Sequence, residues 1–170
     1  GGVPPPAPIL FKAEQDNSSL VFGDKLILKL FRRLESGINP ELEVSRFLAA
    51  KAFAHTPTLA GALEYASGDS RYTLAVVHEF LPHGRSARDY TLEALGRYYD
   101  RVVSWVAQGH SAPPLSAEPL HLLKQDIPPE IAQDIGSYLE SARLLGERTG
   151  ELHLALASDP DDPDFAPEPL

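Results

Sequence analysis

Residues 17–34 read Asn17-Ser-Ser-Leu-Val-Phe-Gly-Asp-Lys-Leu-Ile-Leu-Lys-Leu-Phe-Arg-Arg-Leu34, and they carry the clearest secondary-structure pattern in the chain. Its β-branched, aliphatic and aromatic residues predict two strands, over residues 19–22 and 26–31. Gly23 and Asp24 stand between the two strands and are typical of a tight bend. The stretch therefore predicts a β-hairpin.

Lys29 lies in the middle of the second predicted strand, among aliphatic and aromatic neighbours. An ammonium group is costly to bury there unless an anionic group meets it. Asn39-Pro40 predicts an N-cap followed by the first residue of a helix, and Glu41 and Glu43 follow in its first turns. These two carboxylates fall on opposite shoulders of the apolar stripe of the helix, so either could face the hairpin and pair with Lys29.

Two interpretations of Lys29 remain open at this point. A strand lysine that pairs with a helix carboxylate, beside a turn of small polar residues, is how kinases hold the phosphates of ATP. Alternatively, Lys29 faces solvent on an edge strand, because alternation places Lys25, Ile27 and Lys29 on one face.

Composition limits the class of protein. The 170 residues fit one ordinary domain or two small lobes, and 43% of them are hydrophobic. A formal charge of −9 and a pI near 5.1 argue against nucleic-acid or anionic membrane partners. The small basic patch Lys25, Lys29, Arg32 and Arg33 suits a phosphorylated small molecule better than a polymer.

The chain contains no cysteine, which excludes disulfides and thiolate metal sites and fits an intracellular protein. No apolar run approaches the ~20 residues of a membrane span, and the start lacks the pattern of a signal peptide. We expect a cytoplasmic protein without a membrane partner. Because the chain begins Gly1-Gly2 and has no methionine, we also expect it to be part of something longer.

The predicted fold class is α+β, a small antiparallel sheet with one packed helix followed by a mainly helical part. Residues 1–12 are a proline-rich linker or an expression remnant, and residues 13–82 form the sheet and its helix, with a second hairpin at 59–66 and 72–81. Residues 83–157 are helical, with helices over 90–107 and from Pro128-Pro129 to about Ala157. Residues 158–170 are an acidic, proline-rich tail that we expect to be exposed or packed only in a larger context.

Several motifs are absent or do not fit. The sequence has no Walker A motif and no G-x-G-x-x-G. His78 and His83 resemble a zincin pair, but their spacing is one residue too long and they lie at the end of a strand, so no metal site is predicted. Ser86 has no G-x-S-x-G elbow, and His153 beside the stripe of a long helix is more typical of packing than of catalysis.

Six blocks of the sequence resemble, in the same order, the amino-terminal lobe of bacterial maltokinases. This family is often fused to trehalose synthase, and the resemblance spans from about residue 13 to the end of the chain. The blocks are Ala13-Glu-Gln-Asp-Asn-Ser-Ser19, Gly23-Asp-Lys-Leu-Ile-Leu-Lys-Leu-Phe-Arg-Arg-Leu-Glu35, Gly37-Ile-Asn-Pro-Glu-Leu-Glu43, Leu59-Ala-Gly-Ala-Leu-Glu-Tyr65, Tyr90-Thr-Leu-Glu-Ala-Leu95 and Arg148-Thr-Gly-Glu-Leu-His-Leu-Ala-Leu156.

The resemblance implies a two-lobed, aminoglycoside-kinase-like fold that transfers phosphate from ATP to the anomeric hydroxyl of maltose. It makes Lys29 the phosphate-contacting lysine and Glu43 its partner. It also implies a turn over the phosphates and a hinge whose backbone binds adenine. The turn residues are Asn17, Ser18 and Ser19, and the hinge residues are Glu79, Phe80 and Leu81.

The chain departs from the family pattern in two places. His83-Gly-Arg-Ser-Ala-Arg88 stands where the family shows an Asn-Gln-Gly-Asp-Ala-Trp-like run. The catalytic His-Gly-Asp-x-His loop and the metal-binding Asp-Phe-Glu are absent, so these 170 residues contain no catalytic or metal-binding residue and should not transfer phosphate alone. We expect Mg²⁺ only in a full-length parent, which would bind ATP and maltose and be fused or bound to trehalose synthase. The alternatives are a non-catalytic interaction or regulatory remnant of the kinase fold in a glucan or trehalose pathway, and a related kinase with another small-molecule acceptor.

Overall fold

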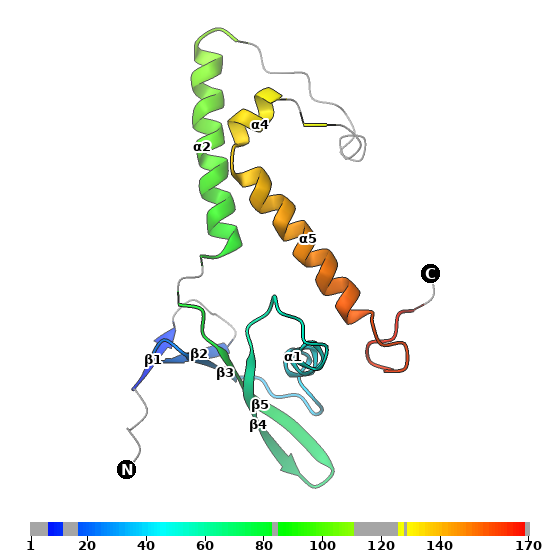
Figure 1. Ribbon diagram of the computed structural model, residues 1–170. Helices are drawn as coiled ribbons and strands as arrows, with labels where there is room; N and C mark the ends of the chain where they lie inside the picture. The colour runs from blue at the N-terminus through cyan, green and yellow to red at the C-terminus, as the bar shows by residue number, and fades with distance from the viewer. Residues whose placement is uncertain (1–6, 12–16, 83–84, 111–125, 128, 169–170) are drawn as a thin grey trace. The chain divides into compact units, whose positions relative to one another are not determined.

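The computed structural model describes residues 7–11, 17–82, 85–110, 126–127 and 129–168 (Figure 1). They form two compact units, one from Gly1–Gly84 and Thr149–Leu170 and the other from Arg85–Arg148. The predicted α+β class is confirmed, because a five-stranded antiparallel sheet is combined with helices. Sequence predictions for residues 1–6, 12–16, 83–84, 111–125, 128 and 169–170 lie outside the described residues.

The sheet of the first unit has the order β1-β2-β3-β5-β4, with every neighbouring pair antiparallel. Both predicted hairpins are confirmed, and Gly23 and Gly68 adopt positive φ angles of 62° and 58° in their turns, where glycine is favoured. The strands are β1 Pro8–Phe11, β2 Asn17–Phe22, β3 Leu26–Phe31, β4 Leu59–Ser67 and β5 Ser70–Glu79. Because β3 is the third of five strands, the interpretation of Lys29 as an edge lysine is wrong.

Helix α1, Pro40–Ala50, connects β3 to β4 and packs against β4 and β5. It begins as the sequence predicts, since the Asn39 side chain accepts a hydrogen bond from the Glu41 N–H at 2.9 Å. The Asn39 N–H in turn donates to the Thr73 hydroxyl at 3.1 Å, which gives this buried threonine of β5 a partner. The start of α1 is thereby fixed to the sheet.

The core of the first unit lies between α1 and one face of the sheet. Leu42 and Val76 are fully buried, at 0% exposure. The strand register places Ser19, Lys29 and Val76 in one row across β2, β3 and β5. The next row is Val21, Ile27 and His78. Because alternate residues share a face, both rows lie on the same side of the sheet.

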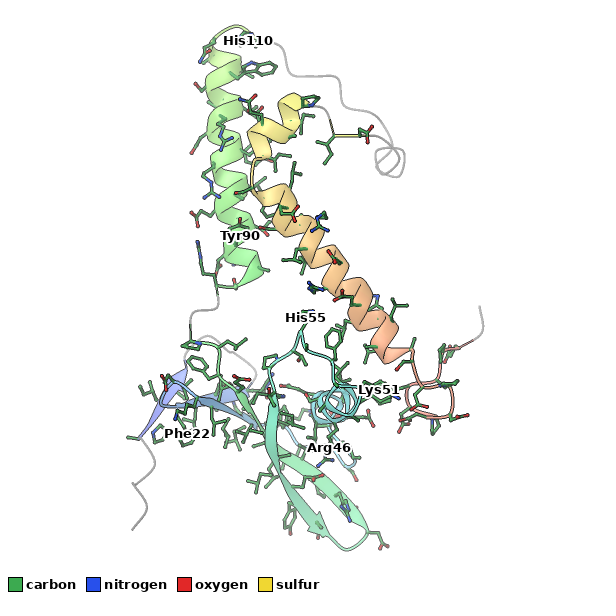
Figure 2. The ribbon with its side chains drawn as sticks, in the orientation of Figure 1. Phe22, Arg46, Lys51, His55, Tyr90 and His110 are labelled. Atoms are coloured by element: carbon green, nitrogen blue, oxygen red, sulfur yellow. The ribbon has the colours of Figure 1, made fainter. Side chains whose placement is uncertain are left out.

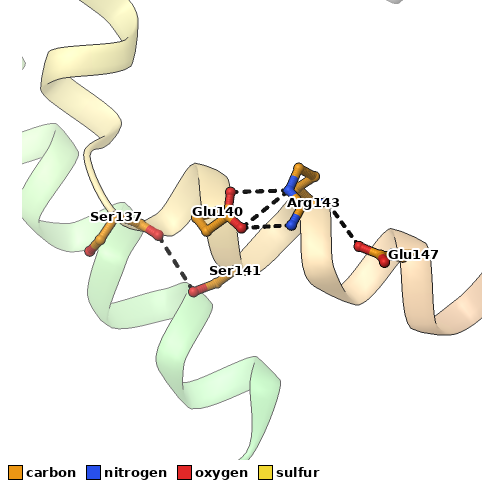
Figure 3. A network of polar contacts seen from close by, with 5 residues as sticks. All are labelled: Ser137, Glu140, Ser141, Arg143 and Glu147. Atoms are coloured by element: carbon orange, nitrogen blue, oxygen red, sulfur yellow. Dashed lines mark hydrogen bonds and ion pairs between the residues drawn. The ribbon is translucent and has the colours of Figure 1, made fainter.

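The second unit contains α2, Ala87–Ala107, α4, Pro129–Ile135, and the start of α5, Tyr138–Leu156. The prediction of one continuous helix from Pro129 is wrong. Gly136 adopts φ 63° and its N–H donates to the Ala132 carbonyl at 2.9 Å, a geometry that ends α4. Arg143 then pairs with Glu140 and Glu147 along the first turns of α5 (Figure 3), as expected for residues three and four apart on a helix.

Tyrosine side chains join α2 to α5 within this unit. The Tyr138 hydroxyl lies 3.0 Å from the Thr91 hydroxyl, and the Ser141 hydroxyl donates to the Tyr90 hydroxyl at 3.2 Å.

None of the helices in the described ranges has the length and apolar character that a membrane span requires.

Candidate functional site

A cavity of about 320 Å³ opens beside the centre of the sheet in the first unit. Its size is at the lower end of the range for ligand pockets. Strands β2, β3 and β5, helix α1 and the loop before β4 all contribute to it. The lining residues are Ser19, Ile27, Lys29, Glu41, Ser45, Thr56, Pro57, His78 and Glu79.

Lys29 of β3 forms an ion pair with Glu41 at this cavity. The Lys29 Nζ lies 2.9 Å from the Glu41 Oε2, and the two side chains are 24% and 36% exposed. A half-buried pair loses less to solvent screening than a surface pair does. The pair fixes one cationic head at the wall of a cavity that has space for a ligand.

The carboxylate that pairs with Lys29 belongs to Glu41, whereas the resemblance gave this role to Glu43. That part of the expectation is therefore wrong. At about 100° per residue, Glu41 and Ser45 lie on one side of the buried Leu42, and Glu43 and Arg46 lie on the other. Arg46 pairs with Glu64 of β4 at 2.8 Å, so the Glu43 side of α1 faces β4. Lys29 lies on β3, which the Glu41 side faces.

His78 of β5 and Ser45 of α1 form a second polar pair at the cavity. The Ser45 hydroxyl lies 3.1 Å from the His78 Nε2, and either tautomer of the imidazole allows this hydrogen bond. Burial lowers the pKa of His78; Glu41 opposes this shift and Lys29 adds to it. His78 is therefore held in its neutral form around pH 7.

The lowered pKa of His78 makes the stability of the first unit depend on pH. The unfolded histidine has a pKa near ~6.5 and takes up its proton before the folded one does, so stability falls as pH drops below about 6.5. We expect the melting temperature to fall between pH 7.5 and 5, and His78→Gln to reduce that fall. The control Leu154→Ala, at an exposed position of α5, should leave the dependence of the melting temperature on pH unchanged. Equal slopes for all three proteins would show that His78 does not titrate as described.

The residues expected to form a turn over the phosphates lie in a strand instead. Asn17, Ser18 and Ser19 are the first residues of β2, because they pair in register with Phe31, Leu30 and Lys29 of β3. Only Ser19 lines the cavity, since strand alternation places its side chain on the same face as Lys29. The Asn17 carbonyl accepts a hydrogen bond from Arg32 at 2.7 Å.

The expected hinge begins where β5 ends, at Glu79. Glu79 lines the cavity, and its carboxylate accepts a hydrogen bond from the Thr58 hydroxyl at 3.0 Å. The N–H groups of Glu79 and Phe80 donate to the carbonyls of Thr58 and Lys25, at 2.9 and 2.8 Å. Among the described residues, the N–H of Leu81 has no such acceptor.

Sequence reasoning missed Ser45 and His78 as members of the site. Two sequence features could have placed them there: Ser45 follows Glu41 by one helical turn, and His78 alternates with Val76 on β5.

Within the part of the chain that the structure describes, no three potential metal ligands come together. The chain matches no known protein-family model.

Proposed function

We propose that this chain is the nucleotide-binding part of an ATP-dependent kinase similar to the bacterial maltokinases, with maltose as the acceptor of the complete enzyme. The observation that carries the proposal is the Lys29–Glu41 ion pair at the wall of the cavity. A strand lysine held by a helix carboxylate is the arrangement with which kinases orient the phosphates of ATP. Lys29 would contact the phosphates, and Glu41 would hold its ammonium group in place.

Backbone groups at the end of β5 are suited to bind the adenine ring. Adenine is bound in kinases by backbone groups next to the last strand of the sheet, and Glu79 lies at both the cavity and that strand end. Within the described part of the chain, the N–H of Leu81 has no protein acceptor and is open to a ligand, whereas those of Glu79 and Phe80 donate to protein carbonyls. The adenine would then lie near Leu81 and the phosphates near Lys29.

The charges at the cavity favour a metal complex of ATP over free ATP. The acidic residues Glu41 and Glu79 and one lysine are among the lining residues, so a bare triphosphate would meet a net negative charge around the cavity. Mg²⁺ would arrive coordinated by the nucleotide and reduce that repulsion. The chain supplies no aspartate base in a His-Gly-Asp-x-His loop, so its proposed role is binding rather than phosphoryl transfer.

The two glutamates of α1 provide a matched test. Glu41→Gln and Glu43→Gln make the same change two residues apart on one helix, but only Glu41 pairs with Lys29. We expect Glu41→Gln to weaken MgATP binding about threefold to tenfold, because the ammonium group loses a charged partner. Glu43→Gln should change it less than twofold. Displacement of a fluorescent ATP analogue measures both.

The outcome of that titration also addresses the rival function. No saturable MgATP binding by the unmodified chain would contradict the nucleotide proposal and favour an interaction module. One observation favours such a module: α2 carries an exposed apolar stripe at helical spacing, with Leu92 50%, Leu95 42%, Tyr99 57% and Val103 67% exposed. If Glu41→Gln and Glu43→Gln changed the MgATP affinity equally, the chain would still bind ATP, but the Lys29–Glu41 pair would have no specific role in binding.

A further inference from the structure

Residues 159–166, here called the strap, follow α5 and fold back beside α1 in the first unit (Figure 1). The expectation of an exposed tail differs from this arrangement, because Asp159, Asp162, Phe165 and Ala166 are half-buried. Aspartate side chains build the strap: Asp159 accepts from the Asp161 N–H at 3.3 Å, and Asp162 accepts from the Asp164 N–H at 3.0 Å. The strap is thus a folded turn.

The same turn presents one aromatic side chain. The N–H groups of Phe165 and Ala166 both donate to the Asp162 carbonyl, at 3.1 and 2.7 Å. The Phe165 ring stacks on Phe47 of α1, with centroids 3.8 Å apart and planes 15° from parallel. Phe47 is only 8% exposed, so this contact covers an apolar side chain on α1.

An ion pair joins the strap to the end of α1 as well. The Lys51 Nζ lies 2.7 Å from the Asp159 Oδ2 and 5.1 Å from the centre of the Phe47 ring. Figure 2 shows Lys51 on the side of α1 that is next to the strap. The hydrogen bond from Lys51 also lowers the pKa of Asp159, so this carboxylate stays ionised at neutral pH.

Helix α1 is therefore held from two sides. Leu42 and Leu48, at 0% and 4% exposure, anchor it in the core, while Phe47 and Lys51 meet the strap. An 11-residue helix has little stability of its own and depends on such packing for its position. The helix also carries Glu41 and Ser45, both of which line the cavity. A helix shift of 1–2 Å would be enough to break an ion pair at 2.9 Å.

We propose that the strap sets the position of α1, and that Phe165 and Asp159 are positioning residues for the Lys29–Glu41 pair although neither lines the cavity. The effect on ATP rests on the proposed function; the effect on α1 does not. Loss of a strap contact should loosen α1 while the sheet stays folded. The ligand site would then weaken through Glu41.

Hydrogen exchange of the full chain without ligand tests this inference first. Phe165→Ala should speed the exchange of α1 amides about threefold to tenfold, the range expected for one aromatic pair. Amides of β5 around Val76 should stay protected, which shows that the sheet remains folded. Phe165→Leu should restore part of the protection, and Asp159→Asn should give a smaller change in the same direction. The control Leu154→Ala removes a side chain that is 75% exposed, and should leave α1 unchanged.

MgATP affinity, measured on the same proteins, separates the two proposals. Faster α1 exchange together with a threefold to tenfold weaker MgATP affinity in Phe165→Ala supports the full inference. Unchanged exchange of the α1 amides would overturn the inference. Equal acceleration of exchange in α1 and β5, in both Phe165→Ala and Asp159→Asn, would overturn it as well. Faster α1 exchange with unaltered MgATP affinity overturns the role of the strap at the site. If the unmodified chain does not bind MgATP, the proposed function fails, and faster α1 exchange still supports the hold of the strap on α1.

Discussion

Lys29→Ala is expected to weaken MgATP binding by about tenfold to a hundredfold. A charge-assisted contact contributes roughly 1.5–3 kcal/mol, and every ~1.4 kcal/mol is a factor of ten in affinity. The substitution also leaves Glu41 at the cavity wall without this ammonium group, where its carboxylate would repel the phosphates. Displacement of a fluorescent ATP analogue, read as a dissociation constant, gives the change.

Lys25→Ala is the matched control for Lys29→Ala. Lys25 precedes β3 by one residue, is exposed and does not line the cavity. Its removal changes the net charge by the same amount, so a general electrostatic effect would appear equally in both variants. If Lys25→Ala weakened MgATP binding as much as Lys29→Ala, a specific phosphate contact by Lys29 would be contradicted.

Leu42→Ala is expected to give the largest loss of stability, about 2–5 kcal/mol in the free energy of unfolding. Leu42 is fully buried at 0% exposure, in the first turns of α1 beside Glu41, so truncation leaves a cavity in the core. Because small domains have only about 5–15 kcal/mol of stability, the loss would take a large share of the total. Urea unfolding followed by circular dichroism measures it.

An exposed leucine of the same unit shows whether burial explains that loss. Leu63 of β4 is 53% exposed, and Leu63→Ala should cost less than about 1 kcal/mol. A loss below ~1 kcal/mol for Leu42→Ala would mean that α1 is not anchored in the core through this residue. The same variant should also weaken MgATP binding, because Leu42 anchors the helical turn that carries Glu41.

The local elements of the first unit could be predicted from the sequence. Gly23-Asp24 between apolar runs, and Asn39-Pro40 before a helical stripe, are short-range signals that depend on neighbouring residues alone. The first hairpin and the start of α1 follow from them. The end of α4 was missed for a similar local reason, since one glycine within an apolar period was given less weight than the period.

The identity of the Lys29 partner could not be predicted, because it depends on the order of the strands. Helical periodicity places Glu41 and Glu43 on opposite sides of α1 without saying which side faces β3. That choice follows from the insertion of β5 between β3 and β4, together with the Arg46–Glu64 pair that turns the Glu43 side toward β4. Strand order depends on contacts between residues far apart in the chain, so a short window of sequence does not reveal it.

The packing of the strap could not be predicted from its amino-acid composition either. Acidic, proline-rich residues are typical of unpacked segments, and on that basis residues 158–170 read as a tail that is exposed or packed only in a larger context. One aromatic residue, Phe165, and the cation of Lys51 change the outcome, and Lys51 lies 108 residues before its partner Asp159. Ser45 and His78 were likewise brought together only by the packing of α1 on β5.

A reactive nucleotide shows whether Lys29 contacts the phosphates of bound ATP. An ATP derivative with an acyl group on its terminal phosphate acylates a lysine amine that lies beside the phosphates, and mass spectrometry of the digested chain identifies that lysine. We expect Lys29 to be the most strongly labelled lysine, with labelling suppressed by excess MgATP and reduced in Glu41→Gln. Labelling of Lys25 or Lys51 equal to that of Lys29, without protection by MgATP, would show that Lys29 does not contact the phosphates.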